Sequence, residues 1–285
     1  MSTSGSDKGS KPTSARDRRD KAAAARAAQE ASEKRRDRTI KIIGGVAVLV
    51  IVGAIVGGAV WQSRSSSTSN GTSIALPTPN PDAALPKGVV NSGDNAYAVP
   101  YGTAPTTAPV LQLWEDFQCP ACASVEKANG QGIEELATGG KAQLFWRPTA
   151  FLDAKLVADN TKAGAPSSSM RAIAAWGCAI DAGKAAEFHN VVFANQPTPE
   201  GAGYTEAALL DFGKQSGISG DAYTTFEKCV KDGTYLGWAV NSLQLFNDKA
   251  VPGTPAAFLN GTEVPNEVLA DKAKLDAAVA AAAKT

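Results

Sequence analysis

The sequence predicts an α/β domain in which a block of helices interrupts a sheet, in the order β-α-β, helical block, β-β-α. Three observations support this class. An apolar run over 110–117 is typical of a buried strand, and it ends in Cys-Pro-Ala-Cys, where a helical pattern begins. Residues 167–248 show helical spacing almost throughout. Asn260-Gly261 separates two short apolar segments, which is a strong signal for a β-hairpin.

The individual elements follow from the same patterns, with glycine and proline as breaks between them. Before the helical block we expect an edge strand, the central strand, a helix that Gly130 and Gly132 would end, a short helical piece and a second strand, at 97–102, 110–117, 120–129, 133–137 and 142–146. The block has five helical segments, at 167–181, 187–195, 205–216, 219–230 and 234–248. Two hairpin strands and an alanine-rich helix close the chain, at 255–259, 262–264 and 268–283.

The first 90 residues differ in composition from the remainder. Residues 1–39 are charged and poor in large apolar side chains, which predicts a disordered basic tail. Residues 40–62 contain an uncharged apolar stretch of the length needed to cross a bilayer as one helix. Residues 63–90 form a serine-rich and then proline-rich linker. We therefore place the folded domain at 91–285, with its helical insertion at about 163–248.

The distribution of charge gives the expected orientation in the membrane. Twelve of the 28 Lys and Arg residues, but six of the 28 Asp and Glu residues, precede residue 42, which leaves a net charge of about −6 beyond it. The positive-inside rule then places the tail in the cytoplasm and the domain outside the cell, on a single-pass anchor. A buried core helix does not fit the charged, low-complexity flanks, and a cleaved signal peptide would have a shorter charged region. The tail has no aromatic residues and its acids are interspersed, so we expect no nucleic-acid binding.

Cys119 and Cys122 lie where the predicted strand passes into the predicted helix. Free backbone N–H groups and the positive end of the helix dipole favour an anionic sulfur there, which lowers the pKa of Cys119. Pro120 suits the first helical position, where its missing N–H leaves no hydrogen bond unmade. With two residues between the thiols, Cys122 can release a chain trapped on Cys119, so the motif predicts thiol–disulfide exchange. A zinc site or an inert disulfide is the alternative, but no second Cys or Cys/His pair is spaced to complete a zinc site.

All four cysteines follow the predicted membrane segment, in a compartment where disulfides persist. Four cysteines allow three pairings, and spacing alone does not choose between them. The chemistry of the Cys-Pro-Ala-Cys motif suggests Cys119 and Cys122 as the working pair, which leaves Cys178 and Cys229 as a structural disulfide. That bond would close a loop of about 50 residues and stabilise the helical block by about 4 kcal/mol.

Three separated motifs resemble those of DsbA-like thiol–disulfide oxidoreductases of the thioredoxin superfamily, in the membrane-anchored form found in high-GC Gram-positive bacteria. They are Glu-Asp-Phe-Gln-Cys-Pro-Ala-Cys at 115–122, Phe-His-Asn-Val-Val-Phe-Ala-Asn-Gln-Pro at 188–197 and Val-Pro-Gly-Thr-Pro-Ala-Ala-Phe-Leu-Asn-Gly at 251–261. The resemblance covers the chain from about residue 97 and implies a thioredoxin fold with an inserted helical domain. It implies that Cys119 is the attacking, partly exposed thiolate and Cys122 the buried resolving thiol.

The same resemblance implies a substrate-binding surface, formed by Pro120 and Ala121 of the motif together with Thr254 and Pro255, which it predicts to be joined by a cis peptide bond. Two positions depart from the family pattern. Ala121 replaces a histidine that strongly oxidising relatives often have. Leu113 replaces an acid that many thioredoxin-fold proteins bury behind the second cysteine, so Glu115, Asp116 or water would supply protons. His189, the single histidine, is more typical of packing than of catalysis.

These observations predict a membrane-tethered, extracytoplasmic enzyme that passes its Cys119–Cys122 disulfide to reduced or unfolded secreted proteins. The family implies reoxidation by a quinone-linked membrane partner, such as a vitamin K epoxide reductase homologue. We expect no organic cofactor and no metal. A reductase or isomerase, or a tethered binding or chaperone domain without catalysis, is the alternative. The sequence does not give the direction of electron flow.

Overall fold

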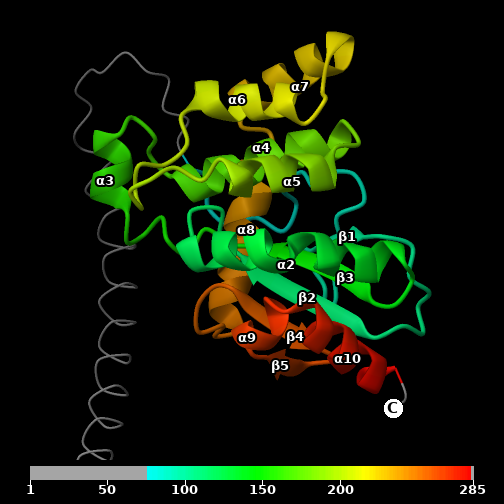
Figure 1. Cartoon of the computed structure of the whole chain (residues 1–285). Coiled ribbons are helices and arrows are strands. Elements are labelled where there is room, and N and C mark those ends of the chain that lie inside the picture. The colour runs from blue at the N-terminus through cyan, green and yellow to red at the C-terminus, as the bar shows by residue number, and fades with distance from the viewer. Residues whose placement is uncertain (1–75, 284–285) are drawn as a thin grey trace, which may run out of the picture. The chain divides into compact units, whose positions relative to one another are not determined.

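A computed structural model of the chain describes residues 76–283. Its centre is a five-stranded mixed sheet with the strand order β1-β3-β2-β4-β5 (Figure 1). The central pair β2 and β3 is parallel, and the other three pairings are antiparallel. The strands are β1 (Val99–Tyr101), β2 (Val110–Glu115), β3 (Gln143–Pro148), β4 (Ala256–Leu259) and β5 (Thr262–Val264).

Helices cover both faces of the sheet and form the block between β3 and β4 (Figure 1). The first of them follows β2 and the last two follow β5, so the predicted order of elements is confirmed. The described helices are α2 (Pro120–Thr138), α3 (Val157–Lys162), α4 (Ser168–Asp181), α5 (Ala185–Ala194), α6 (Glu206–Gln215), α7 (Gly220–Asp232), α8 (Leu236–Asp248), α9 (Asn266–Leu269) and α10 (Lys272–Ala282).

The alternation of side chains along β2 divides the core into two parts. Leu113 is fully buried in the main core, which includes the inner face of α2. Trp114 points to the other face of the sheet, where its ring meets Phe246 of α8 at a centroid distance of 5.5 Å. The strand therefore lies between two apolar layers, and its carboxyl end, where the Cys-Pro-Ala-Cys motif begins, is fixed from both sides.

Helix α2 is longer than the sequence pattern predicts. Gly130 and Gly132 do not end it, and the separate helical piece expected at 133–137 is its last part. Each glycine weakens a helix by about 1 kcal/mol relative to alanine. Both are buried where a methyl group would meet a neighbouring side chain: a Cβ on Gly130 would lie 2.3 Å from Glu126 Oε2, and one on Gly132 would lie 2.1 Å from Asn129 Oδ1. These glycines make room for side chains that fold back over the helix.

The folded region also begins before residue 91. Asn80 is bonded to Asn241 of α8 through both its N–H (2.9 Å) and its carbonyl oxygen (2.6 Å). Pro86 and Val89 are buried, so part of the predicted linker packs on the domain. No helix within residues 76–283 has both the length and the apolar character of a membrane span. The predicted tail at 1–39 and anchor at 40–62 lie outside the described residues and stay predictions.

Candidate active site

Cys119 and Cys122 occupy the junction between β2 and α2, as the sequence predicts. Cys119 is the N-cap residue of α2, in an extended conformation, and Pro120 is at the first helical position. Both cysteines are free thiols. Cys119 is 6% exposed and Cys122 is completely buried, so the first thiol is the accessible one, although it is more enclosed than the resemblance implies.

The surroundings of the two sulfurs separate their acidities. Hydrogen bonds from the Cys122 thiol and from the backbone N–H groups of Cys122 and Ala121 lower the pKa of Cys119 to about 6, against the opposing effect of burial. Burial raises the pKa of Cys122 well above its ordinary value, and the hydrogen bond to Cys119 and the charge of Glu115 act in the same direction. At neutral pH, Cys119 is therefore the thiolate and Cys122 the protonated thiol.

The third motif lies directly against Cys119. The Thr254–Pro255 peptide bond is cis, and the Cys119 thiol lies 3.3 Å from the carbonyl oxygen of Thr254. Pro255 is buried and Thr254 is half-buried, whereas Pro120 and Ala121 are exposed on the other side of the thiol. The four residues expected to bind substrate thus flank Cys119.

Asp116 fixes the loop that precedes Cys119. Its carboxylate accepts hydrogen bonds from the backbone N–H of Gln118 (2.9 Å), the backbone N–H of Leu152 (2.8 Å) and the hydroxyl of Ser169 (2.5 Å). Burial raises the pKa of Asp116 to about 7, with a further contribution from the charge of Asp153. Both carboxylate oxygens of Asp116 therefore accept hydrogen bonds that fix the position of the Cys-Pro-Ala-Cys motif.

Gln196 and Tyr204 hold the same loop from the helical block, and the sequence analysis assigned neither a role. The Gln196 side-chain amide donates to the carbonyl oxygens of Phe117 (2.8 Å) and Cys119 (3.0 Å). The Tyr204 hydroxyl donates to the carbonyl oxygen of Phe117 at 2.7 Å. Gln196 belongs to the second motif of the family resemblance, at 188–197, so its position in that motif was the available signal.

A group of three ionisable side chains, two of them buried and one half-buried, lies close to the thiols. His189 Nε2 of α5 is 3.1 Å from Glu115 Oε2 at the end of β2. Glu126 of α2 completes the group, and one donor atom from each of the three residues lies within 4.8 Å of the others. Burial raises the pKa of both Glu115 and Glu126 to about 8 and lowers the pKa of His189. The spacing would accommodate a cation, but the raised carboxyl pKa values and the imidazole contact also fit a group that shares protons.

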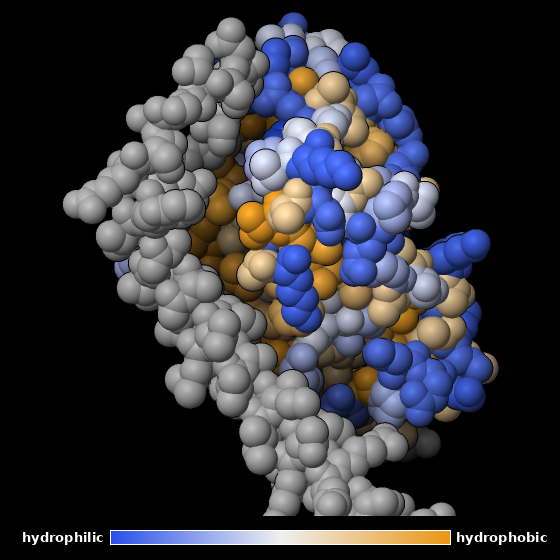
Figure 2. Space-filling model, turned by 90° about the vertical axis from the view of Figure 1, so that its left-hand side faces the viewer, coloured by the Kyte–Doolittle hydropathy of each residue, from blue (hydrophilic) through white to orange (hydrophobic). Residues whose placement is uncertain are grey.

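Apolar side chains gather in the centre of the face that carries α3 and the start of α2, with hydrophilic residues around them (Figure 2). The segment after β3 contributes apolar groups of this kind. Val157 of α3 is 61% exposed, and Phe151 and Leu156 before it are partly buried. An exposed apolar area beside a reactive group is typical of a surface that contacts other chains.

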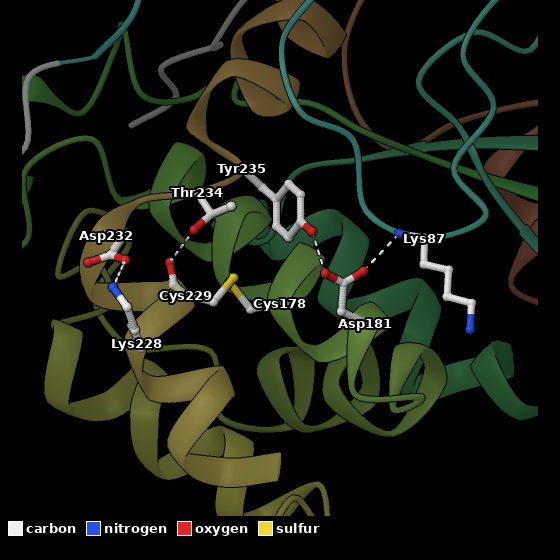
Figure 3. The surroundings of a disulfide bond; sticks show 8 residues. All are labelled: Lys87, Cys178, Asp181, Lys228, Cys229, Asp232, Thr234 and Tyr235. Carbon is white, nitrogen blue, oxygen red and sulfur yellow. Dashed lines mark hydrogen bonds and ion pairs between the residues drawn. A yellow bond between two sulfur atoms is a disulfide. The ribbon is translucent and has the colours of Figure 1, made fainter. Parts of the chain in front are cut away.

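Cys178 and Cys229 form a disulfide, which confirms the predicted pairing. The bond joins α4 to α7 inside the helical block (Figure 3). Near it, the Asp181 carboxylate accepts hydrogen bonds from the Tyr235 hydroxyl and from the backbone N–H of Lys87 at 2.8 Å (Figure 3). The disulfide therefore belongs to the scaffold that also fixes the entry of the chain into the domain.

Comparison with known proteins agrees with this architecture. A thioredoxin family model matches residues 101–279. MdbA from Actinomyces oris, a thiol-disulfide oxidoreductase, is similar over 72% of this chain and 99% of its own, with 22% identity and a TM-score of 0.55. BdbD from Bacillus subtilis is similar over 71% of this chain and 98% of its own, with 16% identity and a TM-score of 0.53. DsbA from Mycobacterium tuberculosis is 25% identical over 66% of this chain and 100% of its own, with a TM-score of 0.49.

No curated protein sequence matches the chain. The two structures with the higher TM-scores share the fold of this chain. The family match covers more than half of the chain, and it includes both cysteines of the motif and the Thr254–Pro255 bond. The predicted resemblance to DsbA-like thiol–disulfide oxidoreductases is confirmed, and the chain belongs to the thioredoxin family.

Proposed function

We propose that the protein is an extracytoplasmic oxidase of secreted proteins, held at the membrane by the segment at 40–62. The observation that supports this most directly is the pair of unequal thiols, with a pKa of about 6 at Cys119 and a pKa well above the ordinary value at Cys122. A thiol of low pKa is a good leaving group in disulfide exchange. Cys119 therefore leaves a mixed disulfide readily, which favours donation of the disulfide to a substrate.

The exchange proceeds in two steps. A substrate thiolate attacks Cys119 Sγ of the Cys119–Cys122 disulfide, a mixed disulfide forms, and Cys122 leaves as a thiolate that takes up a proton. A second substrate thiolate then attacks the substrate sulfur of the mixed disulfide and expels Cys119 as a thiolate. The substrate loses two electrons and gains a disulfide, and the enzyme is left as the dithiol that the structure describes.

Reduced or unfolded secreted proteins are the proposed substrates. Such chains expose apolar side chains, and the face around the start of α2 has an apolar centre (Figure 2). The Thr254 carbonyl lies 3.3 Å from the Cys119 sulfur, so a chain bound along this edge would present its cysteine to the reactive thiol. A membrane tether would raise the effective concentration of the domain near chains emerging from the membrane.

Turnover requires an acceptor for two electrons. We propose a quinone-linked membrane protein, such as a vitamin K epoxide reductase homologue, because a tethered dithiol and a membrane-embedded oxidant meet in two dimensions. No organic cofactor is required by the exchange itself. The proposed location is the cell membrane, with the N-terminus in the cytoplasm and the catalytic domain outside.

The test is oxidation of a reduced unfolded protein by the oxidised full-length chain in detergent. The wild type should convert substrate thiols to disulfides stoichiometrically, Cys119→Ser should have no activity, and Cys122→Ser, loaded as a mixed disulfide at Cys119, should transfer only that bond. Activity that survives Cys119→Ser would contradict the assignment. A reduction potential near that of thioredoxin, about −270 mV, would indicate the alternative function of a reductase.

A further inference from the structure

Glu115, Glu126 and His189 form one group that the exchange steps above do not use, in which Glu115 and His189 are buried and Glu126 is half-buried. Glu126 follows Cys122 by four residues on α2, which places the two side chains one turn apart on the same side of the helix. Glu115 precedes Cys119 by four residues at the end of β2, and its charge acts on Cys122. One carboxyl oxygen of Glu115, one of Glu126 and one ring nitrogen of His189 lie within 4.8 Å of one another. The two acids therefore neighbour both the buried thiol and His189.

The charged residues around this group do not hold its carboxyl groups in the ionised form. Within residues 76–283, no lysine or arginine forms an ion pair with any of the three side chains. Glu134 of α2 acts on Glu126 and His189, and Cys119 acts on Glu115. From β3, Arg147 lines the same cavity as Glu115 and His189, but the contacts of its guanidinium are with the Trp114 ring and the carbonyl oxygen of Asp94 at 3.1 Å.

His189 connects the group to the surface. Its ring is 1% exposed and stacks on Trp146, with a centroid distance of 4.7 Å. Nε2 contacts Glu115 at 3.1 Å, and Nδ1 lies 3.4 Å from Oδ1 of Asn190, an exposed residue whose amide donates to Glu134 at 2.8 Å. A water-sized cavity of about 10 Å³ lies beside Glu115 and His189. The imidazole is thus placed between the carboxyl group of Glu115 and the exposed side chain of Asn190.

We propose that Glu115, Glu126 and His189 form a proton relay that delivers and removes the proton of Cys122 during exchange, with His189 as its connection to solvent. The inference rests on the proposed function and deepens it, since it concerns the same thiol pair. The relay would supply the protons that an acid at position 113 would otherwise supply. In this chain that position is Leu113, which is buried in the apolar core. Of the proton sources that the sequence left open, it selects Glu115 and excludes Asp116, whose oxygens are bound to the loop.

The relay balances the protons of both half-reactions. When substrate thiolate breaks the Cys119–Cys122 bond, Cys122 leaves as a thiolate and takes a proton from the carboxyl pair, which recovers one from solvent through His189. In the reverse direction, the carboxylate removes the proton of Cys122, whose sulfur attacks Cys119 Sγ and expels the bound chain as a thiolate. No electrons pass through the relay.

The experiment uses the reduced full-length chain in detergent, with EDTA and in a parallel series without it, and the aromatic disulfide DTNB as the probe. Attack of Cys119 on DTNB releases the first thionitrobenzoate. Attack of Cys122 on the resulting mixed disulfide releases the second, and stopped-flow absorbance resolves both phases from pH 5 to 9. Glu126→Gln and Glu115→Gln should slow the second phase about 100-fold near pH 7, as expected on loss of a positioned base, and shift its profile to higher pH. His189→Gln should slow it as well, and all three should leave the first phase within about threefold.

Glu135→Gln is the matched control, because Glu135 is an exposed acid of α2 that contacts Gln131 and Lys272. Glu126→Asp should recover part of the second-phase rate, which a purely structural role would not predict. If the rate of the second phase in all three variants equals that of the wild type at every pH, the relay is wrong. The proposed function would remain intact. An absent first phase in the wild type would instead refute the proposed function. A second phase that EDTA abolishes would replace the relay with a metal site and so overturn it.

Discussion

The thiol of Cys119 lies 3.3 Å from the carbonyl oxygen of Thr254, although 135 residues separate them in the chain. This contact joins the two halves of the sheet domain across the whole helical block, which lies between them in sequence. It places the reactive sulfur just before the start of β4, beside the half-buried backbone of Thr254. The helical block then acts on the same loop from the other side, through Gln196 and Tyr204.

Gln196→Glu should disturb the active-site loop without changing the size of the side chain. The amide donates to the carbonyl oxygens of Phe117 and Cys119, and a carboxylate cannot donate to either. The added negative charge near Cys119 also disfavours its thiolate. We expect a higher pKa for Cys119, a rate of substrate oxidation at pH 7 that is lower by about tenfold, and a loss of about 1–3 kcal/mol in the free energy of unfolding. Ultraviolet titration of the thiolate and urea denaturation measure these effects.

Asn195→Asp is the control for that variant. Asn195 precedes Gln196, is exposed, and donates to the carbonyl oxygen of Val191 on its own helix. It should leave the pKa of Cys119 close to the wild-type value. If both variants titrate alike, a general charge effect explains the result and the role of the Gln196 hydrogen bonds is wrong.

Removal of the Cys178–Cys229 disulfide should separate stability from catalysis. The bond closes a segment of 51 residues between α4 and α7. The double change Cys178→Ala and Cys229→Ala should lower the free energy of unfolding by about 4 kcal/mol and the Tm by roughly 10 °C. The rate of the first DTNB phase should stay within about twofold below the new Tm. A large fall in that rate in the folded variant would show that the block controls the thiol more directly than we infer.

Gly130→Ala tests the reason for a glycine inside α2. Alanine favours the helix by about 1 kcal/mol, but its Cβ would lie 2.3 Å from Glu126 Oε2. The end of a flexible side chain moves more readily than the backbone, so we expect Glu126 to leave its buried position. Stability should change by less than about 1 kcal/mol, whereas the second DTNB phase should slow as in Glu126→Gln. A second phase at the wild-type rate would show that Glu126 has no part in the relay.

The sequence predicted the features that depend on local chemistry and periodicity. The Asn260-Gly261 turn has positive φ at both residues, 48° and 82°, as the hairpin requires. Thr205 caps α6 by accepting a hydrogen bond from the N–H of Ala208. The position of Cys119 and Pro120 at the start of α2 followed from helix-terminus chemistry alone.

The features that the sequence did not predict depend on contacts between distant segments. His189 interacts with Glu115, 74 residues earlier, and periodicity on α5 indicates only that its side chain faces the core. In the sequence, Gly130 indicates the end of a helix. The contact that explains a glycine there, the approach of the Glu126 side chain, is visible only in the structure. The sequence did not predict the short helix α3, because its six residues, 157–162, have little apolar periodicity.

The central claim is that the fold holds Cys119 as a thiolate, and titration of that sulfur tests it most directly. The thiolate absorbance at 240 nm of the reduced wild-type protein is followed from pH 4 to 10, with Cys119→Ser as the blank. The high pKa of Cys122 separates the two titrations. The account predicts half-titration of Cys119 near pH 6. Half-titration near 9.0, the value of an unperturbed thiol, would contradict it.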